Sequence, residues 1–192
     1  ELLNREKDQE TAPGIVTGVV KENWDEEHKN MVKVEYRQGE EGKRLSRWMP
    51  VAGVYAGKGF GTYFLPEIGT EVIIAFLMGN VNAPIVIASL WNEQAPALAE
   101  WPNEKNTIKE IRTKGGNRIR FSEEEGKENI EISTPGEQKI RIDDENQKIS
   151  LETKEGKNSI VLDGKSGCIS LDGEKKITLS IGGNACITME QN

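Results

Sequence analysis

The sequence predicts an all-β protein in two parts, a small barrel followed by an array of short, regularly spaced strands. Ten of the eleven aromatic residues and six of the seven prolines precede residue 107, with Phe121 and Pro135 as the exceptions. From Arg118 onward, pairs of apolar residues separated by one residue recur every 8 to 11 residues, which is the spacing of strands that bury one face. No helical period of useful length appears in the first part, although residues 1–10 could form a short polar helix or a frayed tail.

The first part is expected to be a barrel of residues 13–92, preceded by a tail of residues 1–12. Apolar runs indicate five strands, and turn-forming residues such as Pro66 and Gly69 separate them. Five strands in some 90 residues predict a closed barrel of the OB type or a small sandwich. The expected strands cover residues 14–21, 31–36, 47–54, 71–78 and 84–90. The expected core contains Trp24, Tyr36, Trp48, Tyr55, Phe64, Phe76 and Trp91.

A linker of residues 93–106 leads to the repetitive part, residues 107–192. Turn formers such as Pro135-Gly136 and Asp163-Gly164 lie between the apolar pairs, so each pair is expected to mark one strand of about five residues. The side chains predicted to point inward are Ile119, Phe121, Ile130, Ile132, Ile140, Ile142, Ile149, Leu151, Ile160, Leu162, Ile169, Leu171, Ile177, Leu179, Ile187 and Met189.

A single thin sheet of such strands would leave its apolar face in water. Three arrangements could cover that face: three copies of the chain that each form one wall of a prism, a single-chain solenoid, or a flat meander packed on the barrel. A solenoid usually needs more than two apolar positions per turn, and the first part has little spare apolar surface. Burial energetics therefore favour the oligomeric prism.

Charge and composition exclude several classes of function. The formal net charge of −7 argues against binding to nucleic acid, which needs clustered Lys and Arg. No apolar run is long enough to span a membrane. The only histidine, His28, is expected in a solvated loop, and no arrangement of residues predicts a catalytic, metal or cofactor site.

Several short segments could imitate functional sites. The acidic runs 25–27 and 143–145 are expected to be turns rather than carboxylate or Ca²⁺ sites, because they lack the ligand spacing. Residues 57–61 are Gly-rich but lack the strand-before, helix-after context of a phosphate loop. Cys168 and Cys186 fall on the opposite strand parity from the apolar pairs and should face outward as free thiols.

Four segments resemble one known family. Residues 48–76 contain a Gly-rich turn followed by Tyr63-x-x-Pro-x-x-Gly-x-Glu-Val and an apolar strand. Residues 79–92 continue with Gly-Asn-x-x-x-Pro-x-Val and end in Leu-Trp-Asn, residues 106–121 precede the array, and residues 126–130 read Gly-Lys-Glu-Asn-Ile. Together they are similar to the OB domain and β-helix entry of the VgrG and phage baseplate assembly protein V family.

The resemblance implies a homotrimer in which an OB collar leads into an intertwined trimeric β-helix, or β-prism. Such proteins are the central spike of contractile injection machines (phage tails, R-type bacteriocins or secretion-like systems), assembled in the cytoplasm of the producing cell. The spike pierces the target envelope, so the expected role is structural rather than enzymatic. The alternatives are an OB-fold binding module with a fibrous tail, or a receptor-binding tail fibre.

The resemblance also implies partners. A baseplate hub protein is expected above the OB domain, as a separate protein because only about a dozen residues precede Pro13. The linker is too short for an inserted lysozyme domain, and the absence of histidine after His28 excludes an iron-binding His-x-His tip. A PAAR-type tip protein is therefore expected at the C-terminal end, on Ile187, Thr188, Met189, Glu190, Gln191 and Asn192.

Overall fold

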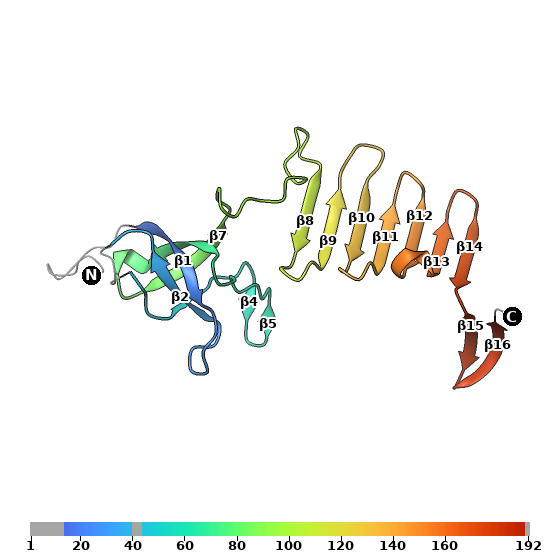
Figure 1. Cartoon of the computed structure of the whole chain (residues 1–192), viewed down its shortest axis with the longest axis horizontal. Coiled ribbons are helices and arrows are strands. Elements are labelled where there is room, and N and C mark those ends of the chain that lie inside the picture. Colours follow the sequence, from blue (N-terminus) through green and yellow to red (C-terminus); the bar gives the residue numbers. More distant parts are fainter. Residues whose placement is uncertain (1–13, 40–43, 191–192) are drawn as a thin grey trace. The chain divides into compact units, whose positions relative to one another are not determined.

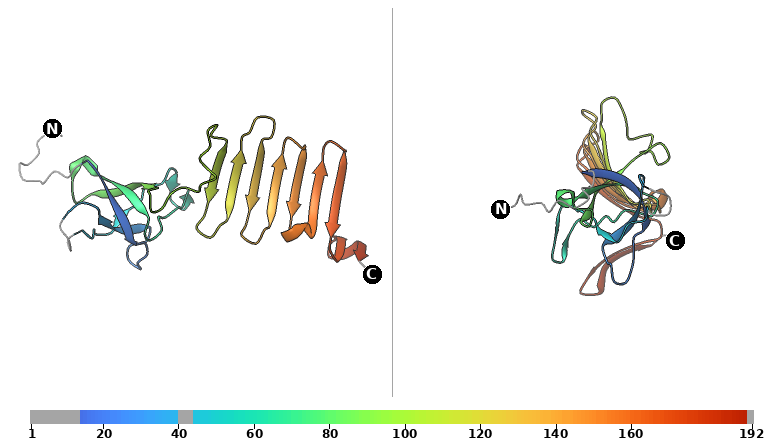
Figure 2. Two further views of the ribbon diagram at one scale, coloured as in Figure 1. Left: turned by 45° about the horizontal axis from the view of Figure 1, so that its top comes forward. Right: turned by 90° about the vertical axis from the view of Figure 1, so that its left-hand side faces the viewer.

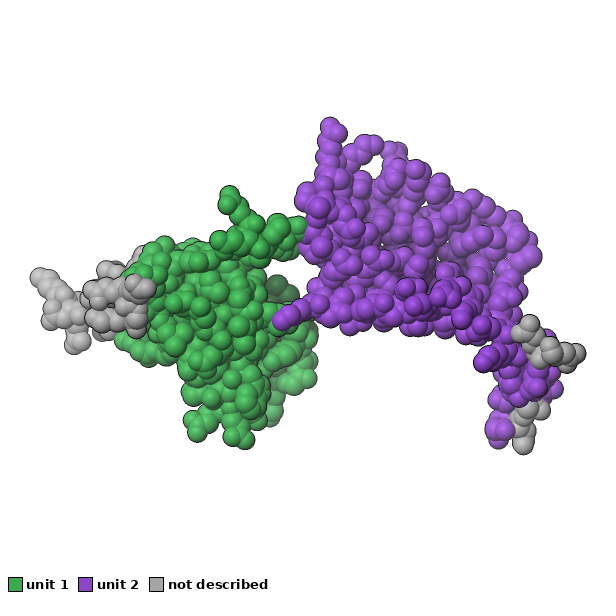
Figure 3. Space-filling model, in the orientation of Figure 1, with its two compact units in different colours: residues 1–97 green, residues 98–192 purple. Residues whose placement is uncertain are grey.

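The structure is a computed structural model that describes residues 14–39 and 44–190. The chain divides into two compact units, residues 1–97 and 98–192 (Figure 3). The boundary falls inside the predicted linker, so its residues 93–97 belong to the first unit and residues 98–106 to the second. The predicted tail of residues 1–12 lies outside the described residues.

The first unit is built on a five-stranded antiparallel sheet of order β3-β2-β1-β6-β7 (Figure 1). A parallel bridge between Val51 and Val86 joins its two edges, and the Ala52 N–H donates to the Val86 carbonyl at 2.8 Å. The sheet therefore curls into the partly closed barrel of an OB fold rather than a sandwich. The strands are β1 (Ile15–Glu22), β2 (Met31–Tyr36), β3 (Met49–Pro50), β6 (Glu71–Phe76) and β7 (Pro84–Leu90).

Two short elements complete this unit. β4 (Ala56–Gly57) and β5 (Phe60–Gly61) form a small hairpin, so the Gly-rich segment 57–61 is a turn, as predicted. A 3₁₀ turn, η1 (Leu77–Gly79), connects β6 to β7.

The core of the barrel differs from the predicted one. It consists of seven aliphatic side chains with no exposed surface: Val20, Val32, Val34, Met49, Val72, Ile74 and Val86. Of the seven aromatic residues expected there, only Tyr36 and Phe76 pack against this cluster, and Trp24, Tyr55, Phe64 and Trp91 are more than 60% exposed. The interior of a small barrel has room for branched aliphatic side chains, so the aromatic rings lie on loops and outer surfaces.

The second unit contains a seven-stranded antiparallel sheet in which each strand pairs with its neighbours in the chain (Figures 1 and 2). One chain thus forms a single-layer meander rather than the coil of a solenoid. The strands are β8 (Ile108–Arg112), β9 (Arg118–Ser122), β10 (Asn129–Ser133), β11 (Lys139–Asp143), β12 (Lys148–Glu152), β13 (Asn158–Asp163) and β14 (Cys168–Gly173). A 3₁₀ turn, η2 (Lys154–Gly156), joins β12 to β13.

Within this sheet one unit of sequence occurs twice. Residues 139–153, which contain β11 and β12, align with residues 159–173 at an offset of 20 residues, so the repeating unit is 139–158. Asp143 and Asp163 occupy equivalent places where their strands end, and Gln147 and Gly167 close the following turns with φ of 53° and 67°. The equivalent turns give the two hairpins the same length and the same alternation of faces.

The last two strands form a separate sheet. β15 (Lys176–Ile181) pairs with β16 (Asn184–Glu190), and a bulge between Leu179 and Ser180 interrupts their register. All eight strands expected from apolar pairs are therefore present, and β8 is an additional strand that the pairs did not predict.

Candidate functional site

The candidate site is the apolar face of the seven-stranded sheet. Because strand residues alternate between faces, the register places two rows of apolar side chains on this face. The first row is Ile111, Ile119, Ile132, Ile140, Leu151, Ile160 and Leu171. The second row is Phe121, Ile130, Ile142, Ile149, Leu162 and Ile169.

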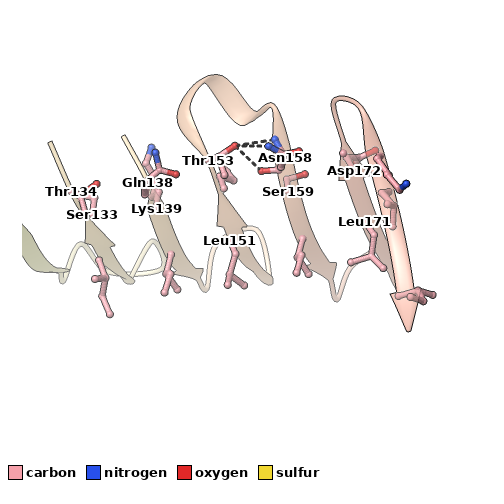
Figure 4. Close-up of a pocket in the computed structure, with 18 residues that line it drawn as sticks. Ser133, Thr134, Gln138, Lys139, Leu151, Thr153, Asn158, Ser159, Leu171 and Asp172 are labelled. Atoms are coloured by element: carbon pink, nitrogen blue, oxygen red, sulfur yellow. Dashed lines mark hydrogen bonds between the residues drawn. The ribbon is translucent and has the colours of Figure 1, made fainter. Parts of the chain in front are cut away.

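These side chains pack against one another along the rows but remain open on their outer side. The members on β9 to β13 are between 36% and 43% exposed, and Ile169 on the last strand reaches 74%. Part of the first row lines a groove of about 590 Å³, into which Ile177 and Leu179 of β15 also project. Leu151 and Leu171 point to the same side of the sheet in Figure 4. An apolar surface this continuous marks an interaction site.

The inward set predicted from sequence is thus brought together for its first twelve members. The other four lie on the β15–β16 hairpin, where Ile177 is opposite Met189 and Leu179 is opposite Ile187. Sequence reasoning missed Ile111, which extends the first row by one strand. On the same face of β8, the position in the second row is occupied by Lys109, which lies opposite Phe121. The strand therefore lacks the apolar pair that marked the other strands.

The opposite, polar face begins with a ladder of alternating charge. Glu110, Arg120, Glu131 and Arg141 lie directly opposite one another on four consecutive strands. Arg120 donates to Glu110, whose side chain is fully buried, and Arg118 donates to Glu131. Opposite charges on neighbouring strands favour this register over one in which like charges meet.

The segment before β8 contributes to the same network. Glu100 accepts a hydrogen bond from Arg120, which holds the pKa of the Glu100 carboxyl below its usual value. Asn103 accepts the backbone N–H of Thr107 at 3.1 Å. These contacts tie the chain that enters the second unit to the polar face of its first strands.

Beyond β11 the central row of the polar face changes character. The positions that continue the ladder are Ser150, Val161 and Ser170, which are small and uncharged. Charge persists in the two flanking rows, one of which contains Glu152 and Asp172, while in the other Lys148 lies 3.3 Å from Asp163. The two faces of the sheet are therefore chemically distinct along its whole length.

His28, the only histidine, is held in place rather than freely solvated. Its Nδ1 lies 2.8 Å from a carboxylate oxygen of Asp25, and its ring stacks on Trp48 with centroids 5.4 Å apart. The Lys33 ammonium lies 4.9 Å from the centre of the same Trp48 ring. His28 lies in a loop, as predicted, with its side chain 41% exposed, and the contacts with Asp25 and Trp48 hold its ring in place there.

The other segments that could imitate sites are turns. Asp143 accepts the Asn146 N–H at 2.9 Å and lies 3.1 Å from Arg141, so its carboxylate is used within the turn. In the part of the chain that the structure describes, no three His, Cys, Asp or Glu residues are grouped to hold a metal ion. Cys168 and Cys186 are exposed and neither is in a disulfide, as predicted.

A second apolar surface lies on the barrel. The hairpin β4–β5 and its flanks expose Tyr55, Phe60, Tyr63 and Phe64 around a depression of about 640 Å³. The Tyr55 and Phe60 rings are tilted against each other with centroids 5.3 Å apart. The loops of residues 51–65 carry a single charged side chain, Lys58.

Across residues 14–39 and 44–190, no helix has the length and hydropathy needed to cross a membrane.

Comparison with known proteins connects this architecture to a family. Residues 16–91 match the family described as the type VI secretion system/phage-baseplate injector OB domain. The chain carries the OB domain of the VgrG and phage baseplate V family. The matched residues begin inside β1 and end just after β7, so they contain all five strands of the barrel.

Relatives of the VgrG type extend the likeness beyond the OB domain. The spike protein VgrG1c of Pseudomonas aeruginosa is 30% identical over 134 residues, which cover 65% of this chain and 18% of that protein. VgrG1a of the same organism is 31% identical over 121 residues, covering 58% of this chain and 19% of VgrG1a. VgrG3 of Vibrio cholerae is 30% identical over 106 residues, which cover 52% of this chain and 10% of VgrG3. The chain thus spans about a fifth or less of the length of these VgrG relatives, which are named type VI secretion system spike proteins.

Proposed function

We propose that the protein is the central spike of a contractile injection machine and acts as a homotrimer. Three meanders would form the walls of a prism, with their apolar faces on the common axis and their polar faces in solvent. The observation that carries this proposal is the two-row apolar face, which no second layer within the described part of its own unit covers.

The energetics support a permanent assembly. Fully burying one aliphatic side chain is worth about 1.5–3 kcal/mol, and a dozen side chains here are still roughly 40% exposed. Covering them would contribute on the order of 10 kcal/mol per chain, which is comparable to the cost of association. The ion-pair ladder on the other face needs no partner, because its charges are already matched across the strands.

The proposed role is mechanical, and it assigns work to each part. The OB domains would form the collar beneath a hub protein of the baseplate. The prism would transmit force to the target envelope, and its C-terminal end would carry a PAAR-type tip protein on Ile187, Thr188, Met189, Glu190 and the two final residues, Gln191 and Asn192. Those last two lie outside the described residues. Assembly in the cytoplasm of the producing cell fits two cysteines that are not in a disulfide.

One measurement tests the assembly. The mass in solution would be determined by light scattering for the full chain and for a chain truncated after Asn106. We expect a trimer for the full chain and a weaker or monomeric state for the truncated one, because the apolar face is removed with the second unit. A monomeric full chain would contradict the spike and favour the alternative in which the barrel covers the meander.

A further inference from the structure

The seven-stranded sheet ends at β14, although β15 follows after only Glu174 and Lys175. A connection this short normally joins two paired strands. Here β15 pairs only with β16, and the outer edge of β14 has no strand partner within the described residues. An open edge with Ile169 and Leu171 beside it would attract another strand, so a stable particle must cover it.

The hairpin leaves the sheet on its apolar side. Gly173 allows the departure, because a Cβ there would lie 2.9 Å from Cγ1 of Ile177 and 3.1 Å from the Lys176 carbonyl oxygen. Ile177 and Leu179 then line the same groove as Leu171 and four other members of the first apolar row. Leu171 is labelled at this end of the groove in Figure 4. In the proposed prism, the apolar side is the side on which the other copies lie.

β14 and β15 are complementary in sequence. If Leu171 is placed opposite Ile177 in an antiparallel pair, Ile169 falls opposite Leu179 on the same face. On the other face this register places Asp172 opposite Lys176, and Ser170 opposite Thr178. Asp172 makes no ion pair among the described residues, so the register would supply its counter-charge. Apolar and opposite-charge pairs of this kind stabilise neighbouring strands.

We propose that β15 of each chain pairs with the free β14 edge of a neighbouring copy, in the register that places Leu171 opposite Ile177. This inference rests on the proposed trimer and specifies how its distal end is closed. Exchange of an identical element between copies is a low-cost route to assembly, and a short hinge such as Glu174-Lys175 favours it. Three exchanged hairpins would link the three walls in a ring.

The test places a cysteine pair across the proposed contact. In the full chain with Cys168→Ser and Cys186→Ser, Asp172→Cys and Lys176→Cys would be combined, since both side chains lie on the polar face in this register. The chains would be oxidised, or treated with a short bismaleimide that does not need disulfide geometry, and separated on a non-reducing denaturing gel. We expect covalently linked trimers.

The matched control uses a pair that the structure places within one chain. Ser159 and Asp172 are opposite each other on β13 and β14, so Ser159→Cys with Asp172→Cys is expected to link within a monomer. A test pair that links only within one chain, or that neither reagent links, would overturn the exchange if light scattering still shows a trimer. A monomer in solution would overturn the exchange and the proposed function together.

Discussion

Gly18 shows how closely two strands of the barrel approach each other. A Cβ at this position would lie 2.4 Å from Cγ1 of Val34 and 2.8 Å from the Glu35 carbonyl oxygen. Val34 belongs to the fully buried core, so its side chain cannot move aside without disturbing the other core residues. The backbone of β1 therefore requires glycine for reasons of space.

Gly18→Ala is expected to destabilise the barrel by about 1–3 kcal/mol, the usual cost of overpacking. Thermal unfolding followed by tryptophan fluorescence would measure this, because three of the four tryptophans, Trp24, Trp48 and Trp91, belong to the first unit. Gly14→Ala is the matched control, since a Cβ there meets nothing within 4 Å. Equal melting temperatures for the two variants would show that β1 and β2 are less closely packed than described.

Asp163 makes the stability of the second unit depend on pH. Its carboxylate accepts the backbone N–H groups of Ser166 and Lys165 and lies near Lys148. The hydrogen bond from Ser166, with help from Lys148, lowers the pKa of Asp163 below its usual 3.8. Because the pKa is lower in the folded state, this stabilisation is present above pH 3.8 and is lost as the pH falls through the folded-state pKa.

The expected result is that Asp163→Asn melts below the parent at pH 7 and that the difference shrinks as the pH falls below 3.8. Asp143→Asn, at the equivalent place in the repeat, should behave in the same way, since the pKa of Asp143 is also lowered by hydrogen bonds from Asn146. Melting temperatures between pH 7 and strong acid would check both. A difference that stayed constant into acid would remove the carboxylate as its cause.

Among the elements, the two equivalent turns differ at one informative place. Gln147 and Gly167 both have positive φ, a conformation that costs a non-glycine residue about 1 kcal/mol. Gln147→Gly is therefore expected to stabilise the second unit by up to about 1 kcal/mol, and Gly167→Ala to destabilise it by about the same amount. Denaturant unfolding would measure the free energy of unfolding of both variants. The prediction requires that this free energy increases for Gln147→Gly and decreases for Gly167→Ala.

The elements also show what sequence alone could predict. The apolar pairs located eight strands because burial of one face imposes a period of two, which is visible in a single sequence. β8 was missed because Lys109 replaces the apolar partner of Ile111. The aromatic core of the barrel was predicted wrongly, since the number of large side chains says nothing about the width of the space that must be filled.

The candidate site was predictable in part for the same reason. Strand parity assigned the inward residues of β9 to β14, and the structure places them on one face. The departure of β15 could not be predicted, because Asp172-Gly173 looks like every other turn signal in the array. Which strands pair depends on backbone geometry at Gly173 that the residue type alone does not determine.

At the scale of the whole molecule, substitutions at two neighbouring residues of β13 can show whether assembly depends on the apolar face of the sheet. Ile160 lies on the apolar face, whereas Val161 continues the central row of the polar face. Ile160→Asp would bury three charges near the proposed axis and is expected to abolish the trimer. Val161→Asp should leave the trimer intact. Light scattering compares them, and equal assembly of both variants would show that the faces are assigned wrongly.

Deletion of residues 139–158 tests whether the array is modular. The deletion removes one complete unit of the repeat, and Ser159 then takes the place of Lys139 with the same alternation of faces. We expect a trimer that still forms and a particle shorter by about 10 Å, because two strands are lost at about 4.8 Å each. Small-angle scattering would measure the length, and failure to assemble would show that the units are not interchangeable.

Because every strand adds the same distance to the meander, the number of strands determines the length of the sheet. Seven strands give six intervals of about 4.8 Å, a span of about 29 Å. The hydrocarbon layer of a bilayer is about 30 Å thick. If the proposed prism forms, its length would change only in steps of one hairpin, so duplication or loss of a 20-residue unit would match its reach to envelopes of different depth without altering its cross-section.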